Sequence, residues 1–269
     1  MPGSIAQTLE ALKERVAALE TQPVLADSAP AGAREGLLLT SPGALHEVFA
    51  PLQADAGAAL GFALGHARSF VAPGRSGIIF LQLRQDAQEL GLPYGLGLSR
   101  FGLETDALVL IRTETIIELL WAMEEAIACR AVAAVVADIA YPHRALDFTA
   151  SRRLALRAAA SGASVFVMRY SDGREASAAR YRWRVSPFAS PPVPFDDRAP
   201  GPPRWRVWLE KGSLGSGRRT GVQDEGMVVD WTENGFAIAQ MGDADAGQRT
   251  KTLARAPSAA LGDRLSETG

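Results

Sequence analysis

The sequence predicts an α/β fold in which a mostly parallel sheet is flanked by helices. Two short runs, residues 132–137 and 164–168, are almost continuously apolar, which is typical of strands buried on both faces. Segments with the apolar spacing of helices separate these and similar runs along the chain. Because alternating strands and helices connect by right-handed crossovers, this order favours parallel strands with helices on both faces.

The core elements are expected in a regular order along the chain. Strands are predicted over the segments 44–49, 77–83, 107–112, 132–138 and 164–170. Helices are predicted over 56–71, 114–129 and 149–161, and either Asp147 or Thr149 can cap the last of them. A sixth strand over 180–185 alternates apolar with basic side chains, which predicts a sheet-edge or antiparallel strand with a charged outer face.

The N-terminal region, residues 1–21, is predicted to be an amphipathic helix that precedes a core domain over 36–187. Its apolar side chains recur at steps of four and three residues, which places them on one helix face. These side chains are Ile5, Leu9, Leu12, Val16 and Leu19. A helix of about 15 residues is marginal on its own in water, so we expect this one to dock on another surface.

The C-terminal region is predicted to be a β-hairpin attached through a proline-rich linker. Residues 186–203 hold seven of the sixteen prolines, and we expect an extended linker over 188–203 without an element of its own. Alternating strands over 204–210 and 227–231 then predict a hairpin appendage within 204–241, and 242–269 is expected to be a disordered tail. This boundary predicts that residues 204–269 can be removed without unfolding the core.

Composition excludes several classes of protein. The 269 residues are 47% hydrophobic and carry a net charge of −2, so the chain is neither a uniformly basic coat nor an acidic disordered chain. Cys129, expected in the core, is the only cysteine, and three scattered histidines suggest no metal site. The N-terminus does not resemble a signal peptide, and no apolar run reaches the roughly 18 residues of a membrane helix. A cytoplasmic protein is expected.

Charge is distributed unevenly, which suggests two kinds of contact. Residues 151–222 carry a net charge of +9 and residues 223–248 a net charge of −6, and this contrast fits either a partner surface or neutralisation between neighbouring strands. Five arginines are candidates for phosphate contacts, with a solvated face as the alternative. They are Arg169, Arg174, Arg180, Arg182 and Arg184. Trp205 and Trp208 point to opposite faces of one strand, so we consider them, with Trp231, as anchors of a partner interface.

The turn after the first predicted strand lacks the groups that bind a nucleotide triphosphate. A phosphate-binding loop has the pattern G-x-x-x-x-G-K-[ST], in which the lysine neutralises the phosphates and the hydroxyl holds Mg²⁺. Here Gly57 is present, but Ala58 and Ala59 occupy the positions of the lysine and the hydroxyl. The chain has no lysine between Lys13 and Lys211. We therefore expect no phosphoryl-transfer activity, no cofactor and no metal.

Several segments resemble known proteins. Residues 43–51 resemble the strand that enters the phosphate-binding loop of RecA-type recombinases, and residues 121–126, 133–138 and 146–154 resemble the ImuA family, over about 43–186 in all. The resemblance implies a RecA-like core. By position it places Arg84 where RecA has its catalytic glutamate, Asp138 at the acidic residue that closes the fourth core strand, and Met168-Arg169 at the pair that senses the γ-phosphate.

The resemblance to ImuA implies a role in DNA repair. ImuA proteins are RecA-like accessory factors of mutagenic translesion synthesis in the SOS response to DNA damage. It implies a non-catalytic adaptor, associated with the nucleoid, that binds an ImuB-like homologue of Y-family polymerases and, indirectly, an error-prone C-family polymerase. RecA and DNA are further candidate partners, and the N-terminal helix would dock on another copy, on RecA or on its own core. A weak ATP-dependent DNA-binding RecA paralogue and a SulA-like inhibitor of cell division remain alternatives.

Overall fold

The computed structural model describes residues 40–193, 196–214 and 226–239. The predicted N-terminal helix and the predicted tail lie outside these residues. Within the described part, no helix is long and apolar enough to cross a membrane.

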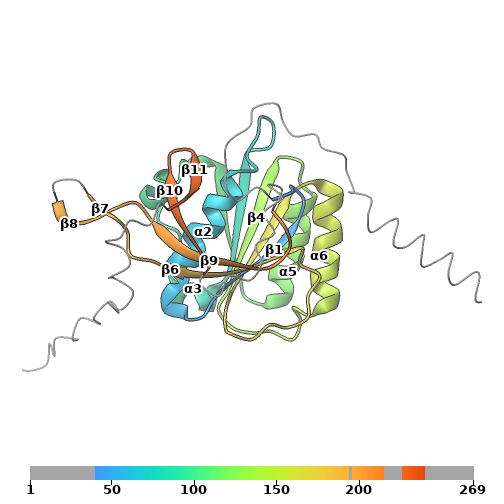
Figure 1. Ribbon diagram of the computed structural model, residues 1–269. Coiled ribbons are helices and arrows are strands. Elements are labelled where there is room, and N and C mark those ends of the chain that lie inside the picture. Colours follow the sequence, from blue (N-terminus) through green and yellow to red (C-terminus); the bar gives the residue numbers. More distant parts are fainter. Residues whose placement is uncertain (1–39, 194–195, 215–225, 240–269) are drawn as a thin grey trace, which may run out of the picture. The chain divides into compact units, whose positions relative to one another are not determined.

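A nine-stranded sheet with the order β11-β10-β9-β6-β1-β5-β4-β2-β3 forms the centre of the fold (Figure 1). The six strands from β6 to β3 are parallel, and β9, β10 and β11 extend the sheet as antiparallel strands. The strands are β1 Leu45–Ala50, β2 Gly77–Leu83, β3 Leu108–Thr113, β4 Val132–Ile139, β5 Ser164–Tyr170, β6 Tyr181–Pro187, β9 Arg204–Lys211, β10 Met227–Thr232 and β11 Gly235–Ile238. The predicted α/β class with a mostly parallel sheet and a C-terminal antiparallel hairpin region is confirmed.

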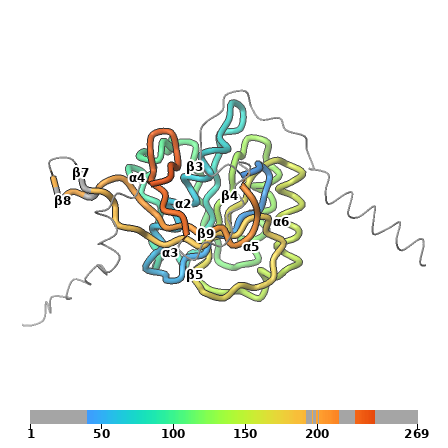
Figure 2. Tube along the Cα trace, in the orientation of Figure 1, coloured from blue at the N-terminus to red at the C-terminus, as the bar shows by residue number. Residues whose placement is uncertain are grey.

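Helices cover the two faces of the sheet. Helix α2 (Ala56–Arg68) packs on one face, and α5 (Ile116–Ala128) and α6 (Phe148–Ser161) lie side by side on the other (Figure 2). Two short helices, α3 (Arg84–Leu90) and α4 (Gly95–Ser99), follow β2, and two 3-10 turns lie at Gln53–Asp55 (η1) and Thr105–Ala107 (η2). A capping box of Thr115 and Glu118 starts α5. Asp147, one of the two predicted caps, accepts the Ala150 N–H at 2.7 Å and starts α6.

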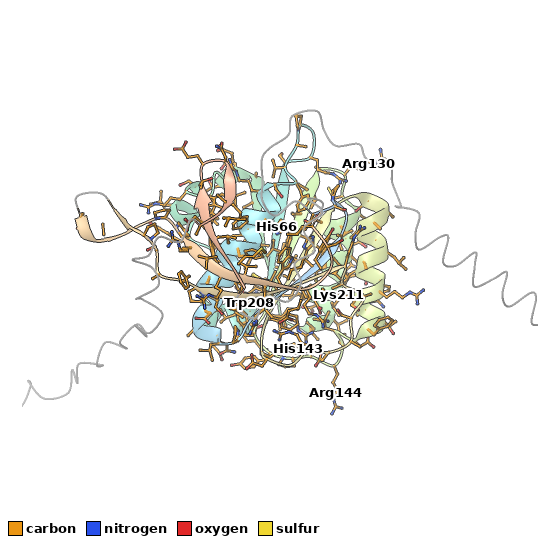
Figure 3. All side chains as sticks on the ribbon, viewed as in Figure 1. His66, Arg130, His143, Arg144, Trp208 and Lys211 are labelled. Carbon is orange, nitrogen blue, oxygen red and sulfur yellow. The ribbon has the colours of Figure 1, made fainter. Side chains whose placement is uncertain are left out.

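Each face of the sheet has its own apolar core, because the strands that helices cover alternate their side chains between the two layers. The core under α2 includes Phe62 and Trp183, together with Trp205 and Trp231 from the antiparallel strands. The core under α5 and α6 is built mainly from aliphatic side chains of β2, β4 and β5 and of the two helices. Figure 3 shows how densely side chains fill both layers; His66, for example, lies in the layer of α2.

Three expectations from the sequence need correction. β6 is not an edge strand, because it lies between β1, to which it is parallel, and β9, to which it is antiparallel. The proline-rich segment is not free of elements: β6 continues to Pro187, and β7 (Pro192–Val193) pairs with β8 (Asp196–Pro200) in a small separate sheet. Cys129 is exposed at the end of α5 and not in the core.

The C-terminal hairpin is joined to the core sheet by hydrogen bonds. β9 pairs with β6 from Arg182↔Lys211 to Pro187↔Trp205, so the hairpin extends the main sheet. The sequence also did not predict β11, which pairs with β10 and places Phe236 opposite Trp231.

Candidate functional site

The carboxyl ends of the parallel strands meet at one edge of the sheet, which is where ligands gather in open α/β folds. At this edge β1 ends at Ala50, a 3-10 turn follows, and α2 begins at Ala56. Gly57, Ala58 and Ala59 lie in the first turn of α2. None of the residues from Pro51 to Ala59 carries a basic side chain, so the first turn of α2 offers no side-chain cation to a phosphate.

Asp138 is held at this edge by two neutral groups. Gln82 Nε2 donates to one carboxylate oxygen at 2.9 Å, and the Tyr170 hydroxyl donates to the other at 2.7 Å. Burial raises the pKa of Asp138 to about 6, partly offset by the hydrogen bond from Tyr170. Burial, together with the nearby charge of Asp138, also raises the pKa of Tyr170, which keeps its hydroxyl protonated as the donor. Both oxygens of Asp138 thus have protein partners.

Asp86 is a second buried carboxyl at the same edge, and the sequence analysis did not predict it. It lies on α3, and one of its oxygens accepts the Ala140 N–H at 2.9 Å while the other has no hydrogen-bond partner among the described residues. Burial raises the pKa of Asp86, and its negative charge contributes to the raised pKa of Asp138. Gln82, a polar side chain within an otherwise apolar strand, signals a buried polar partner, but that partner is Asp138 and not Asp86.

The remaining positions that the resemblance relates to nucleotide chemistry are Arg84 and the pair Met168-Arg169. Arg84 begins α3 and forms an ion pair with Glu114 at the surface. Met168 is buried in β5. The described residues contain no group of three or more His, Cys, Asp or Glu side chains that could hold a metal ion.

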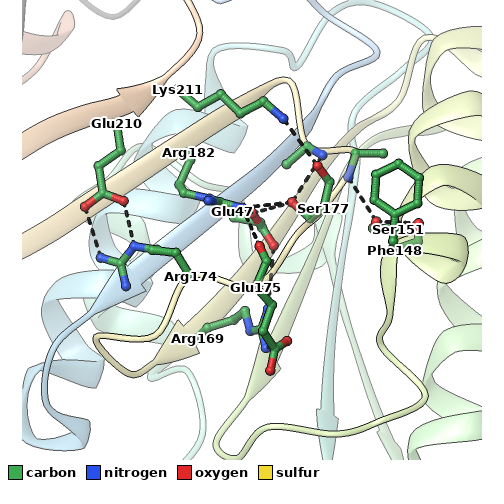
Figure 4. A network of polar contacts seen from close by, with 12 residues as sticks. Glu47, Phe148, Ser151, Arg169, Arg174, Glu175, Ser177, Arg182, Glu210 and Lys211 are labelled. Atoms are coloured by element: carbon green, nitrogen blue, oxygen red, sulfur yellow. Dashed lines mark hydrogen bonds and ion pairs between the residues drawn. The ribbon is translucent and has the colours of Figure 1, made fainter.

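The predicted arginine cluster lies over β1, β5 and β6 and is neutralised largely from within (Figure 4). Glu47, buried on β1, accepts two hydrogen bonds from Arg182 at 3.0 and 2.8 Å and one from Ser177 at 2.6 Å. Arg169 is buried, lies 3.6 Å from Glu47 and donates to Glu175 at 2.7 Å. Charged side chains on neighbouring strands and loops therefore pair with one another in this cluster, through acids that lie outside residues 223–248.

The other three arginines of the prediction are arranged differently. Arg174 makes a bidentate pair with Glu210 at 2.6 and 3.0 Å and lies over the ring of Phe49 at 4.0 Å. Arg184 lies 3.8 Å over the ring of Trp208 and 3.7 Å from Glu210. Arg180 is exposed at the start of β6. Contact of these five arginines with phosphate stays a prediction.

The tryptophans of the C-terminal strands are placed mainly in the core. Trp205 and Trp231 are 3% and 7% exposed. Trp205 donates its indole N–H to the Ala58 carbonyl at 2.9 Å, and Trp231 donates to the Arg100 carbonyl at 3.1 Å. Trp208 points to the opposite face, as predicted, and is half-buried. Of the three interface candidates, Trp208 alone therefore keeps an accessible part, and the contact with a partner is untested for all three.

The fold defines a class: an α/β protein with a mostly parallel sheet flanked by helices, consistent with a RecA-like core. A stretch of 125 residues, 43% of the chain, is 38% identical to Protein ImuA of Caulobacter vibrioides strain NA1000 and covers 49% of that protein. Protein ImuA of a second Caulobacter vibrioides strain, ATCC 19089, matches with the same values. No protein-family model matches the chain. The chain spans about half the length of the curated relatives it matches, and these relatives confirm the resemblance to ImuA predicted from the sequence.

Proposed function

We propose that this protein is a non-catalytic adaptor in the mutagenic translesion-synthesis complex of the SOS response. The resemblance to ImuA supports the pathway, and the carboxyl edge of the sheet supports the non-catalytic role. The observation that carries the proposal is Asp138, whose two carboxylate oxygens are taken by Gln82 and Tyr170. Each oxygen of this acidic residue already accepts a hydrogen bond from a neutral neighbour, so its observed contacts stabilise the edge of the sheet.

The electrostatics of the edge support the same role. A triphosphate is stabilised by a lysine and a metal ion in nucleotidases, because negative charge in a partly buried site must be compensated. Here the first turn of α2 has no basic side chain, and two buried carboxyls lie at the same edge. Nucleotide binding would place further negative charge beside Asp138 and Asp86. A scaffold that has lost turnover but keeps its fold is suited to holding other proteins.

The proposed main partner is an ImuB-like homologue of Y-family polymerases, through which the chain would associate with an error-prone C-family polymerase. RecA and DNA are further proposed partners. This part of the proposal depends on the resemblance to ImuA.

Two measurements test the adaptor. With the purified full chain, we expect no ATP hydrolysis and no saturable binding of Mg-ATP up to about 1 mM, which corresponds to a binding free energy weaker than about −4 kcal/mol. We also expect the full chain to capture the ImuB-like protein encoded in the same cells. ATP turnover that Asp138→Asn abolishes would contradict the non-catalytic role, and failure to bind the ImuB-like protein would contradict the partnership.

A further inference from the structure

The outer surface of α5 and α6 exposes more bulky apolar side chains than a solvated helix layer requires. On α5, Ile117 and Trp121 are 63% and 66% exposed, and on α6, Phe148 and Leu156 are 49% and 62% exposed. These four residues, with Glu125 and Arg152, are called the α5–α6 face below. Apolar side chains gathered on one surface mark interaction sites more often than scattered ones do.

The charges of this face are segregated by helix. All charged residues within α5 are acidic (Glu118, Glu124 and Glu125), and all charged residues within α6 are basic (Arg152, Arg153 and Arg157). The α5–α6 face therefore presents a negative ridge beside a positive ridge, with apolar side chains on both.

Part of this charge is compensated within the molecule. Glu124 binds Arg153 at 2.8 Å and Arg157 at 3.1 Å, and Glu118 accepts backbone N–H groups at the start of its own helix. Glu125 and Arg152 are exposed, and neither has an ion-pair partner among the described residues. One unpaired charge of each sign is thus left on the face, the acid on α5 and the base on α6.

A cavity between the N-terminal halves of the two helices gives the face a concave part. Its volume is about 490 Å³, and its apolar lining includes Ile117, Leu120, Trp121 and Ala150. This volume is within the range of sites that enclose a bulky group. The exposed indole of Trp121 at its rim is the kind of side chain that anchors interfaces.

We propose that the α5–α6 face is a two-fold interface with a second copy of this chain. In a two-fold arrangement the same patch serves both partners, so α5 of one copy lies on α6 of the other. Glu125 then faces Arg152 of the second copy, and the two-fold axis forms this pair twice. A second copy of the chain therefore places a charge of opposite sign against each of the two helices. This proposal does not depend on the proposed adaptor function, because that function concerns binding to other proteins and this one concerns binding between two copies of the chain.

Helix packing is compatible with this arrangement. Ile117 and Trp121 on α5, and Arg152 and Leu156 on α6, are spaced by four residues, so each pair lies along one ridge of its helix. Ridges of this spacing interdigitate between helices of two molecules as they do within one. Leu156 would pack against the Trp121 ring of the second copy, which buries two of the most exposed apolar side chains of the face.

The first test is the oligomeric state of the full chain by sedimentation velocity over a series of micromolar concentrations. We expect a monomer–dimer equilibrium, and we expect Trp121→Ala to weaken dimerisation at least tenfold. Leu96→Ala is the matched control, because Leu96 is 69% exposed on a helix outside the face. A chain that stays monomeric at every concentration would overturn the proposal. So would self-association that Trp121→Ala leaves unchanged.

Charge reversal provides the second test, and it distinguishes a specific two-fold contact from general stickiness. Glu125→Arg and Arg152→Glu should each weaken the dimer several-fold, because each places like charges opposite one another. The double variant restores opposite charges in exchanged positions and should dimerise like the unmodified chain. Circular dichroism checks that the variants remain folded. A double variant as weak as the single ones would overturn the two-fold arrangement.

Discussion

Asp138 lies in surroundings that favour the neutral form of its carboxyl group. Its pKa of about 6 lies above the ordinary value near 3.9 because burial disfavours the carboxylate. Between these two pH values the folded chain binds more protons than the unfolded chain. The stabilisation that the protonated Asp138 side chain contributes to folding is therefore complete below about pH 4 and is lost as the pH rises to about 6.

Asp138→Asn should remove this pH dependence. The asparagine oxygen can accept from the Tyr170 hydroxyl, and its NH2 can donate to Gln82 once the Gln82 amide flips so that its oxygen faces position 138. We expect the stability of the variant relative to the unmodified chain to rise by about 2 kcal/mol from pH 4.5 to pH 8, because most of the two-unit difference in pKa acts within this range. Urea unfolding at the two pH values measures this gain.

The difference in stability between the unmodified chain and the Asp138→Asn variant separates the effect of Asp138 from that of other titrating groups, because both chains contain those groups. His46, for example, is fully buried, and burial lowers its pKa, so it destabilises both chains alike on acidification. Asp172→Asn, at an exposed acid, is the control. A gain that is equal at pH 4.5 and pH 8 would contradict the raised pKa of Asp138.

Arg182 is expected to act as the structural partner of Glu47. Arg182→Ala leaves a buried carboxylate with Arg169 as its remaining basic neighbour and should cost about 3 kcal/mol of stability. Thermal or urea unfolding measures this loss, and adding Glu47→Gln should recover part of it. Arg180→Ala is the control, because Arg180 is exposed. Equal stability of the two alanine variants would show that the pair with Glu47 contributes little.

At the scale of elements, α2 and the antiparallel strands fit closely because two glycines of the helix lack side chains. Gly61 and Gly65 are four residues apart and share one side of α2. A Cβ atom at Gly65 would lie 2.8 Å from the Trp231 ring and 3.0 Å from the Phe236 ring. At Gly57, in the first turn of the same helix, a Cβ atom would meet nothing within 4 Å.

Alanine at these two glycines should therefore have opposite effects. Gly65→Ala should destabilise the protein by about 1–3 kcal/mol, because the packed rings must move. Gly57→Ala should stabilise it by about 0.5–1 kcal/mol, because alanine lowers the entropy of the unfolded chain at a position with free space. Chemical denaturation of both variants checks the pair. Destabilisation by Gly57→Ala would mean that the start of α2 is more crowded than the structure shows.

At the scale of the whole molecule, the C-terminal strands complete the core. Trp205, Val207, Val229, Trp231 and Phe236 are all buried there. Burial of each large apolar side chain contributes about 2 kcal/mol, so these five residues together contribute about 10 kcal/mol, comparable with the net stability of a whole domain.

Deletion of residues 204–269 should consequently unfold the core, contrary to what the proline-rich segment suggested from the sequence. Deletion of 240–269 alone should leave the described part folded, since β11 ends at Ile238. Far-ultraviolet circular dichroism and the cooperativity of urea unfolding distinguish the two chains. A cooperative transition in the shorter chain would restore the idea of a separable hairpin.

Much of the fold was predictable because it follows from local patterns. The strands over 77–83 and 164–170 have exactly the predicted bounds, since each is a short apolar run with clear ends. The neighbours of β6 were not predictable, because alternation of side chains does not reveal which strands pair on either side. At the candidate site, the resemblance to RecA pointed to Asp138 at the end of the fourth core strand, whereas Asp86 depends on how α3 lies against the sheet edge.

Cys129 provides a practical handle on the association of two copies. It is the only thiol of the chain, and it is exposed where α5 ends. A maleimide dye therefore attaches at one known point without any engineering of the sequence. Mixing donor-labelled with acceptor-labelled chains would then report in real time, by energy transfer, how often two molecules meet and how long they remain together.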